Sequence, residues 1–197
     1  MLKINKKAGV DEVGRGCLAG PVFAAAVILN NNIDIKDIKD SKKIPFKKRI
    51  LLSSYIKKNS IYAVGSASVE EIDKINILNA SLLAMKRALG KLNCEPSLAY
   101  IDGPFAPQNL KINYKTIVKG DEKITCISAA SIVAKATRDI FMIKLSKKYP
   151  RYGWDKNFGY GTKDHLKLLK INGITKHHRK TFKPIHKILM GKARETQ

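Results

Sequence analysis

The stretch KAGVDEVGRGCLAGPVFAAAVIL, residues 7–29, contains two strand-like segments separated by a glycine-rich turn. The first segment is short and ends at the acidic pair Asp11-Glu12. The second, Val22–Leu29, is apolar throughout, which is typical of a buried strand. Several glycines and the dipeptide Gly20-Pro21 lie between the two segments and indicate a tight reversal of the chain. The stretch therefore predicts two strands, with carboxylates at the end of the first.

The segments that follow extend this pattern. Ser68 and Glu71 form a capping-box pattern that predicts the start of a helix. An earlier helix is expected to place Leu51, Leu52 and Tyr55 on its apolar face. The expected strands are 61–68, 98–101 and 114–118, and the expected helices are 41–58, 68–92 and 126–148, with a polar loop over 30–40 and a glycine-rich loop over 152–161. This order predicts an α/β layer with a mixed sheet, followed by a basic helical tail.

The chain of 197 residues is strongly basic, with 38 Lys and Arg against 16 Asp and Glu and a formal net charge of +22. Residues 144–197 hold 15 of these cations and 3 of the acids, a net +12. Such clustering favours a polyanionic partner, either nucleic acid or an anionic membrane surface, although a generally lysine-rich proteome is an alternative explanation.

Other bulk features narrow the class of protein. The scattered residues Cys17, Cys94 and Cys126 show neither a disulfide framework nor the spacing of a zinc site. The apolar run Val22–Leu29 is too short to cross a bilayer, and the N-terminal residues lack the apolar core of a secretory signal. We therefore expect a cytoplasmic protein that does not bind a membrane.

Acidic residues follow three of the predicted strands: Asp11 and Glu12, Asp102, and Asp121. Neighbouring strand ends lie about 5 Å apart, so these carboxylates could converge on one small volume. Carboxylates packed in this way repel one another unless cations neutralise them, and oxygen ligands suit Mg²⁺ or Mn²⁺. A pair of such cations is a common device for phosphodiester hydrolysis. The alternative is that these acids are ordinary turn residues or helix caps.

The ordered motifs of the chain resemble those of ribonuclease HII. The segment GVDEVGRGCLAGPV, residues 9–22, is similar to the one that opens the bacterial family. The other similar segments, in the family's order, are Asp40-Ser41-Lys42-Lys43, Tyr100-Ile101-Asp102-Gly103, Lys119-Gly120-Asp121, Ser128–Lys135 with Thr137-Arg138-Asp139, Gly159-Tyr160-Gly161-Thr162 with His165, and His178-Arg179 with Phe182. The resemblance spans about residues 8–184, which is nearly the whole chain.

The resemblance implies a ribonuclease H-like mixed sheet flanked by helices, with a catalytic domain over 1–150 and a basic C-terminal helical extension over 151–197 packed on it. It implies a monomeric, metal-dependent endonuclease that uses Mn²⁺ or Mg²⁺. The implied substrates are RNA–DNA hybrids and duplex DNA containing ribonucleotides, cut 5′ to a ribonucleotide to leave 5′-phosphate and 3′-hydroxyl ends. The implied catalytic and metal-binding residues are Asp11, Glu12, Asp102 and Asp121.

The resemblance also implies how the substrate is recognised. Gly14-Arg15-Gly16 is similar to the family loop whose backbone contacts the ribonucleotide 2′-hydroxyl, the group that distinguishes RNA from DNA. Tyr160 is similar to the family tyrosine that packs on the sugar beside the cut. The chain departs from the family at Cys17, commonly proline, which could loosen the turn, and at Phe158, commonly lysine, which removes a possible phosphate contact.

Two other functions stay open. A non-catalytic, basic nucleic-acid-binding protein would explain the charge but not the acids at several strand ends. A ribonuclease H-like nuclease of different specificity, such as a junction resolvase or transposase, would not explain the Gly14-Arg15-Gly16 loop or Tyr160.

Several residues of the matching segments have less defined roles. Asp139 is expected to form structural ion pairs. The role of His165 is open, and His177, His178 and His186 are expected to be scaffold residues because hard cations prefer oxygen ligands. Four cations are expected either to contact phosphates or to lie on solvated helix faces: Lys42, Lys43, Lys135 and Arg138.

Overall fold

The computed structural model describes residues 6–31, 33–34, 38 and 44–195. Within these ranges five strands form one sheet of order β3-β2-β1-β4-β5. The strands are β1 (Lys7–Val13), β2 (Val22–Leu29), β3 (Ser60–Ala67), β4 (Leu98–Asp102) and β5 (Tyr114–Ile117). Strand β1 lies at the centre, antiparallel to β2 and parallel to β4. The mixed sheet predicted from the sequence is therefore confirmed.

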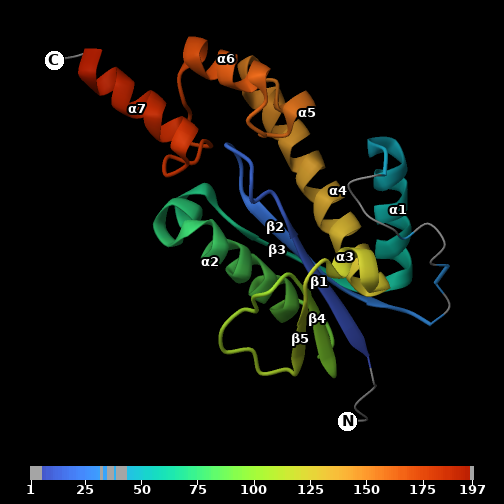
Figure 1. Ribbon diagram of the computed structural model, residues 1–197. Coiled ribbons are helices and arrows are strands. Elements are labelled where there is room, and N and C mark those ends of the chain that lie inside the picture. The colour runs from blue at the N-terminus through green and yellow to red at the C-terminus, as the bar shows by residue number, and fades with distance from the viewer. Residues whose placement is uncertain (1–5, 32, 35–37, 39–43, 196–197) are drawn as a thin grey trace.

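Helices cover both faces of this sheet (Figure 1). One face packs against α2, and the opposite face packs against α1 and α4. The helices are α1 (Phe46–Asn59), α2 (Val69–Gly90), α3 (Gly120–Lys123), α4 (Thr125–Lys148), α5 (Trp154–Asn157), α6 (Lys163–Asn172) and α7 (Lys183–Glu195), and a short 3-10 helix η1 (Pro150–Tyr152) follows α4.

Helix α4 lies very close to the central strand. A side chain at Gly9 of β1 would overlap the backbone of Cys126, so only glycine fits there. The small residues Ala129, Ala130 and Ala134 of α4 are fully buried in the same interface. This close packing sets the short distance between α4 and the sheet.

Helix α2 begins with the predicted capping box. The Ser68 hydroxyl accepts a 3.1 Å hydrogen bond from the Glu71 amide, and the Glu71 carboxylate accepts one of 2.8 Å from the Ser68 amide. The helix is not continuous, because Asn76 has a left-handed φ of 65° inside it. The prediction of a single helix over 68–92 is therefore right in extent but misses this break.

The prediction for α1 is only partly right. Leu51 is 71% exposed and Tyr55 39% exposed, whereas Arg49 is buried with Leu52 and Ile56. The buried position of Arg49 depends on an ion pair with a distant residue, which helical periodicity cannot reveal. The first predicted residues of this helix, 41–43, and most of the 30–40 loop lie outside the described residues.

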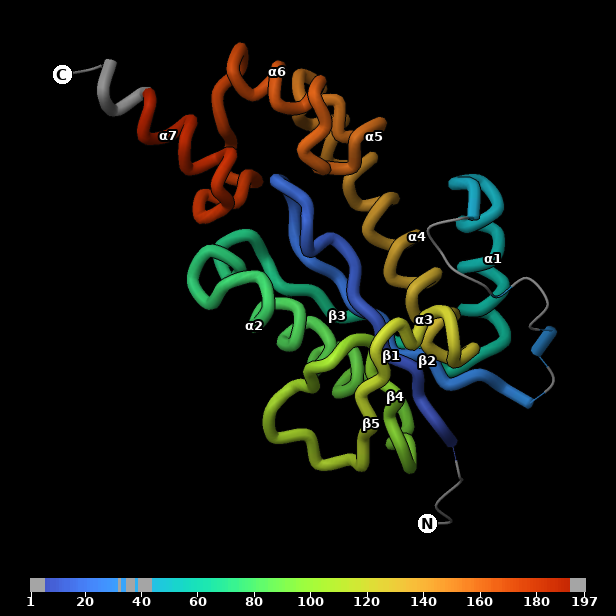
Figure 2. Tube along the Cα trace, viewed as in Figure 1, coloured from blue at the N-terminus to red at the C-terminus, as the bar shows by residue number. Residues whose placement is uncertain are grey.

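The C-terminal helices pack on the far end of the sheet layer. Figure 2 shows the connection between β1 and β2 reaching the segments around α5, α6 and α7. A third apolar cluster joins Leu18 and Ala19 of that connection to Met142 of α4, Leu169 of α6 and Ile185 of α7. The division at residue 150 stays a prediction. Among the described residues, no helix has the length and hydropathy needed to cross a membrane.

Candidate active site

Three carboxylates meet where β1 and β4 lie side by side. The parallel register pairs Val10 with Ile101, so the next residue on each strand is an aspartate, Asp11 on β1 and Asp102 on β4. Each of these aspartates, and Glu12, offers a carboxylate oxygen, and these three oxygens lie within 4.8 Å of one another. The sheet thus brings together three of the four acids predicted as metal ligands.

The surroundings of these acids disfavour their negative charges. Burial raises the pKa of Asp11 well above its ordinary value, and the charges of Glu12 and Asp102 raise it further. Burial also raises the pKa of Glu12, while the guanidinium of Arg15, 3.3 Å from its carboxylate, acts in the opposite direction. An all-oxygen cluster with this mutual repulsion is suited to hard divalent cations, which fits the predicted Mg²⁺ or Mn²⁺.

The fourth predicted acid, Asp121, is not one of the three members of this cluster. It is buried in α3, which begins directly after Lys119, a residue with a left-handed backbone that follows β5. The amide of Gly120 donates a 2.6 Å hydrogen bond to the Asp102 carboxylate. The Asp121 carbonyl accepts one of 2.6 Å from Ser128 on α4. Asp121 is therefore anchored one residue away from a group that contacts the cluster.

The Gly14-Arg15-Gly16 loop follows the acids, and its two glycines have different structural reasons. Gly14 has a φ of 97°, and a side chain there would overlap Arg138. Among the described residues, chain neighbours aside, no atom lies within 4 Å of the position that a Cβ on Gly16 would take. The packing of the described residues therefore requires glycine at position 14, whereas at position 16 it does not.

Two buried arginines hold this loop and its continuation. Arg179 donates to the carbonyls of Arg15 (2.9 Å) and Gly20 (2.8 and 3.0 Å). Arg138 donates to the carbonyls of Ala19, Pro21 and Phe158, at 2.9–3.1 Å. Both side chains are fully buried, and burial lowers the pKa of Arg179 to about 10, which leaves it charged at neutral pH.

The prediction that Arg138 contacts phosphate or lies on a solvated face is wrong, because its guanidinium is consumed by backbone carbonyls. The structural role of Arg179 was not predicted from the sequence. Each bonds to residues more than 100 positions away, and the sequence carries no local signal for such a contact.

Tyr160 stands against the same loop. It forms a β-bridge with Cys17, and the neighbouring Leu18 amide donates a 2.7 Å bond to the Gly159 carbonyl. The Tyr160 side chain remains 37% exposed, and its pKa is raised to about 12, chiefly by burial, so the hydroxyl stays protonated. The structure therefore brings the two predicted sugar-contacting elements, the glycine loop and Tyr160, together.

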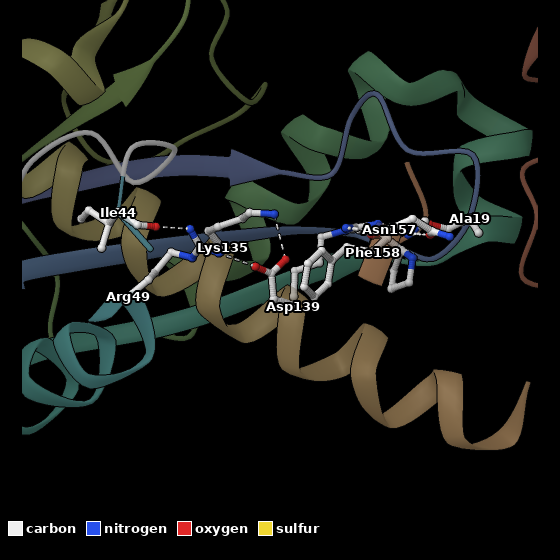
Figure 3. A network of polar contacts seen from close by, with 10 residues as sticks. Ala19, Ile44, Arg49, Lys135, Asp139, Asn157 and Phe158 are labelled. Carbon is white, nitrogen blue, oxygen red and sulfur yellow. Dashed lines mark hydrogen bonds and ion pairs between the residues drawn. The ribbon is translucent and has the colours of Figure 1, made fainter. Parts of the chain in front are cut away.

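A chain of ion pairs joins α1 to α4 (Figure 3). Arg49 of α1 and Lys135 of α4 approach the buried Asp139 carboxylate from two sides, at 2.9 and 2.8 Å. The Lys135 ammonium lies 5.3 Å from the Tyr160 ring centre and 5.2 Å from that of Phe158. The expectation that Asp139 forms ion pairs is confirmed. The Lys135 ammonium lies near the two rings and does not extend into open solvent.

The remaining predicted residues divide into two groups. His178 is buried and accepts a hydrogen bond from the Thr175 amide, as expected of a scaffold residue. His165, whose role the sequence leaves open, is also buried and contacts the Tyr160 backbone. The Asp40-Ser41-Lys42-Lys43 segment lies outside the described residues, so the expectations for Lys42 and Lys43 stay predictions.

A mixed sheet with clustered carboxylates at the ends of adjacent strands defines the class of ribonuclease H-like, divalent-metal-dependent nucleases. The ribonuclease HII family model matches residues 8–187. Ribonuclease HII of Pelagibacter ubique is 63% identical over 184 residues, covering 92% of this chain and 98% of that protein. Ribonuclease HII of Roseobacter denitrificans is 48% identical over 188 residues, covering 95% of each.

Solved structures agree. Ribonuclease H2 from Pyrococcus horikoshii OT3 superposes with a TM-score of 0.80 at 29% identity, covering 94% of this chain and 98% of that one. The chain therefore belongs to the ribonuclease HII family, and it is an endonuclease that hydrolyses the RNA strand of RNA–DNA hybrids. The non-catalytic alternative is set aside by this membership.

Proposed function

We propose that this ribonuclease recognises one ribonucleotide within a duplex and cuts on its 5′ side, with Asp11, Glu12, Asp102 and Asp121 holding Mg²⁺ or Mn²⁺. The observation that carries the proposal is the adjacency of three elements: the carboxylate cluster, the Gly14-Arg15-Gly16 loop that follows it in the chain, and Tyr160 bridged to Cys17. The cellular role that follows is removal of misincorporated ribonucleotides and of primer RNA.

The acids fit the cations on chemical grounds. Asp11 and Glu12 are disfavoured as free anions by burial and mutual repulsion, so their carboxylates gain most from a bound cation. Bound divalent cations supply activation of water and stabilisation of the leaving oxygen in phosphodiester hydrolysis. The chain itself orients the cluster, since the Gly120 amide holds one Asp102 oxygen and the Glu12 amide bonds to Asp11 at 2.7 Å.

Sugar recognition is supported by the contrast between the two glycines. A Cβ at Gly16 would have open space around it, since no described residue beyond its chain neighbours has an atom within 4 Å. Close approach of a substrate sugar to the main chain would explain why glycine stands there. The partly exposed Tyr160 ring, with Lys135 and Arg138 beside it, gives that sugar a rigid apolar surface.

The test uses three duplexes that differ at one sugar: deoxyribose throughout, one ribonucleotide, and one 2′-O-methyl nucleotide. With Mg²⁺ or Mn²⁺, we expect cutting of the single-ribonucleotide duplex alone, and with a chelator no cutting at all. Cutting of the all-DNA duplex, or failure on the single ribonucleotide, would overturn the proposal.

The Gly16→Ala variant sharpens this test. It should fold with wild-type stability, because the added methyl group meets no atom of the described residues beyond its chain neighbours, yet it should lose cleavage. Gly14→Ala is the matched comparison and should lower the melting temperature, because the backbone there is left-handed and Arg138 is in the way. A Gly16→Ala enzyme with full activity would remove the main chain at position 16 from the sugar contact.

A further inference from the structure

Behind Tyr160 lies a buried group of rings: Trp154, His165 and His178, all with no exposed surface. The Trp154 indole N–H donates to Nε2 of His165 at 3.1 Å, and Nδ1 of His165 lies 2.9 Å from the Tyr160 carbonyl oxygen. The Nε2 atoms of the two histidines are 3.4 Å apart. The Thr175 amide donates to Nδ1 of His178 at 2.9 Å.

These contacts fix which nitrogen of His165 carries its proton. An indole nitrogen can only donate, so Nε2 of His165 must accept from Trp154. A neutral imidazole has one donor and one acceptor, so Nδ1 carries the hydrogen and donates it to the Tyr160 carbonyl. His178 has the opposite tautomer, since its Nδ1 accepts from the Thr175 amide and its Nε2 therefore carries the hydrogen.

Both histidines are neutral under ordinary conditions. Burial lowers the pKa of His165, and burial together with His165 lowers that of His178 to about 3. A metal ion between the two Nε2 atoms would have to displace the Trp154 donor, so this pair is a hydrogen-bonded scaffold rather than a metal site.

Tyr160 needs such an anchor. The two residues before it, Phe158 and Gly159, both have left-handed backbones, with φ of 48° and 82°. Its carbonyl is held by the Thr162 amide at 2.9 Å in a local turn and by His165 from the first turn of α6. The His165 bond thus ties the Tyr160 carbonyl to α6, while Arg138 ties the neighbouring Phe158 carbonyl to α4.

The same rings reach the other side of the site. His178 forms a β-bridge with Ala19, two residues after Cys17, which bridges Tyr160. The glycine-rich connection and the Tyr160 turn therefore both contact the same buried group of rings.

We propose that His165 is a positioning residue for ribonucleotide recognition: its Nδ1–H, fixed by the Trp154 N–H, holds the Tyr160 backbone so that the ring meets the substrate sugar. This inference rests on the proposed role of Tyr160. His165 itself does not touch substrate. Its loss should therefore act on turnover through misplacement of the scissile phosphate, while duplex binding through lysine and arginine side chains persists.

The experiment compares two amide substitutions of one histidine on duplex DNA containing a single ribonucleotide. The amide nitrogen of asparagine lies near the place of Nδ1 of histidine, and that of glutamine lies near Nε2. His165→Asn should keep a turnover number close to wild type because it can still donate to the Tyr160 carbonyl. His165→Gln should lower kcat by roughly 10- to 100-fold with little change in KM.

A double-variant cycle links the effect to Tyr160. If His165 acts through Tyr160, the His165→Gln and Tyr160→Ala pair should be no slower than Tyr160→Ala alone. Independent effects that multiply would overturn the proposal, as would a folded His165→Gln enzyme with wild-type kcat. A Tyr160→Ala enzyme with wild-type kcat would instead sink the proposed role of Tyr160 itself.

A measurement on the unaltered protein stands apart from folding of the variants. Nitrogen NMR of the labelled His165 ring should show the hydrogen on Nδ1 and a bare Nε2 at neutral pH. The opposite tautomer, or a ring in exchange between both, would overturn the inference whether or not the variants fold.

Discussion

Lowering the pH should destabilise the folded protein through His178 in particular. The pKa of this side chain is about 3 in the fold, against 6.5 for a free histidine, because the ring is buried beside His165. Between these values the unfolded chain binds a proton that the folded chain does not. Stability from this group is therefore complete above pH 6.5 and is lost as the pH falls toward 3.

The magnitude follows from the size of the shift. A pH of 5 lies 1.5 units below the pKa of 6.5 of the unfolded histidine, whereas the folded histidine is still neutral. Each pH unit in this range changes the free energy of unfolding by about 1.4 kcal/mol. The loss between pH 8 and pH 5 is thus about 2 kcal/mol from His178, with a further loss in the same direction from His165, whose pKa is also lowered by burial.

Urea unfolding at pH 8 and pH 5 measures this loss. Between the two pH values the free energy of unfolding of His178→Gln should fall by about 2 kcal/mol less than that of the wild type. The matched control is His186→Gln on α7, because His186 is exposed and its ring meets water in both states. If His178→Gln and His186→Gln lost equal stability on acidification, the buried neutral state of His178 would be refuted.

Three further outcomes are expected. Asp102→Asn should abolish cleavage of a labelled hybrid yet bind it at least as tightly, since one negative charge leaves the site, and retained cleavage would contradict the metal assignment. Arg179→Met should lower the free energy of unfolding by roughly 3 kcal/mol, because buried carbonyls lose their donor, and an unchanged urea midpoint would contradict this. Replacing the exposed Lys163, Lys167 and Lys170 of α6 by Gln should flatten the salt dependence of hybrid binding. The slope of log Kd against log salt should decrease by about 0.9 per phosphate contact removed, and an unchanged slope would place the binding face elsewhere.

Local patterns predicted much of the fold because they report local physics. The apolar run Val22–Leu29 has the same bounds as β2, and the Ser68 and Glu71 capping box opens α2 as expected. The gathering of the acids could be anticipated in the same way, since Asp11 and Asp102 each belong to the end of a strand. Strand ends of one sheet are near one another whatever the rest of the chain does.

The failures concern side chains whose partners are distant in sequence. Arg49 of α1 is buried while Leu51 of the same helix is exposed, because Asp139, 90 residues away, supplies the counter-charge for Arg49. Arg138 looks like a surface cation in the sequence, yet its guanidinium is buried and donates to the carbonyls of Pro21 and Ala19, more than 100 residues away. No periodicity encodes these pairings, since a buried charge is decided by what it meets across the fold.

The bond from Arg179 to Arg15 also sets an order of events during synthesis. The two residues are 164 positions apart, so at translation rates of about 5–20 residues per second the anchor follows its loop by roughly 10 to 30 seconds. A nascent chain therefore makes Asp11 and Glu12 164 or more residues before the guanidinium that holds the neighbouring loop. During that interval the loop beside the carboxylates exists without the side chain that will hold it.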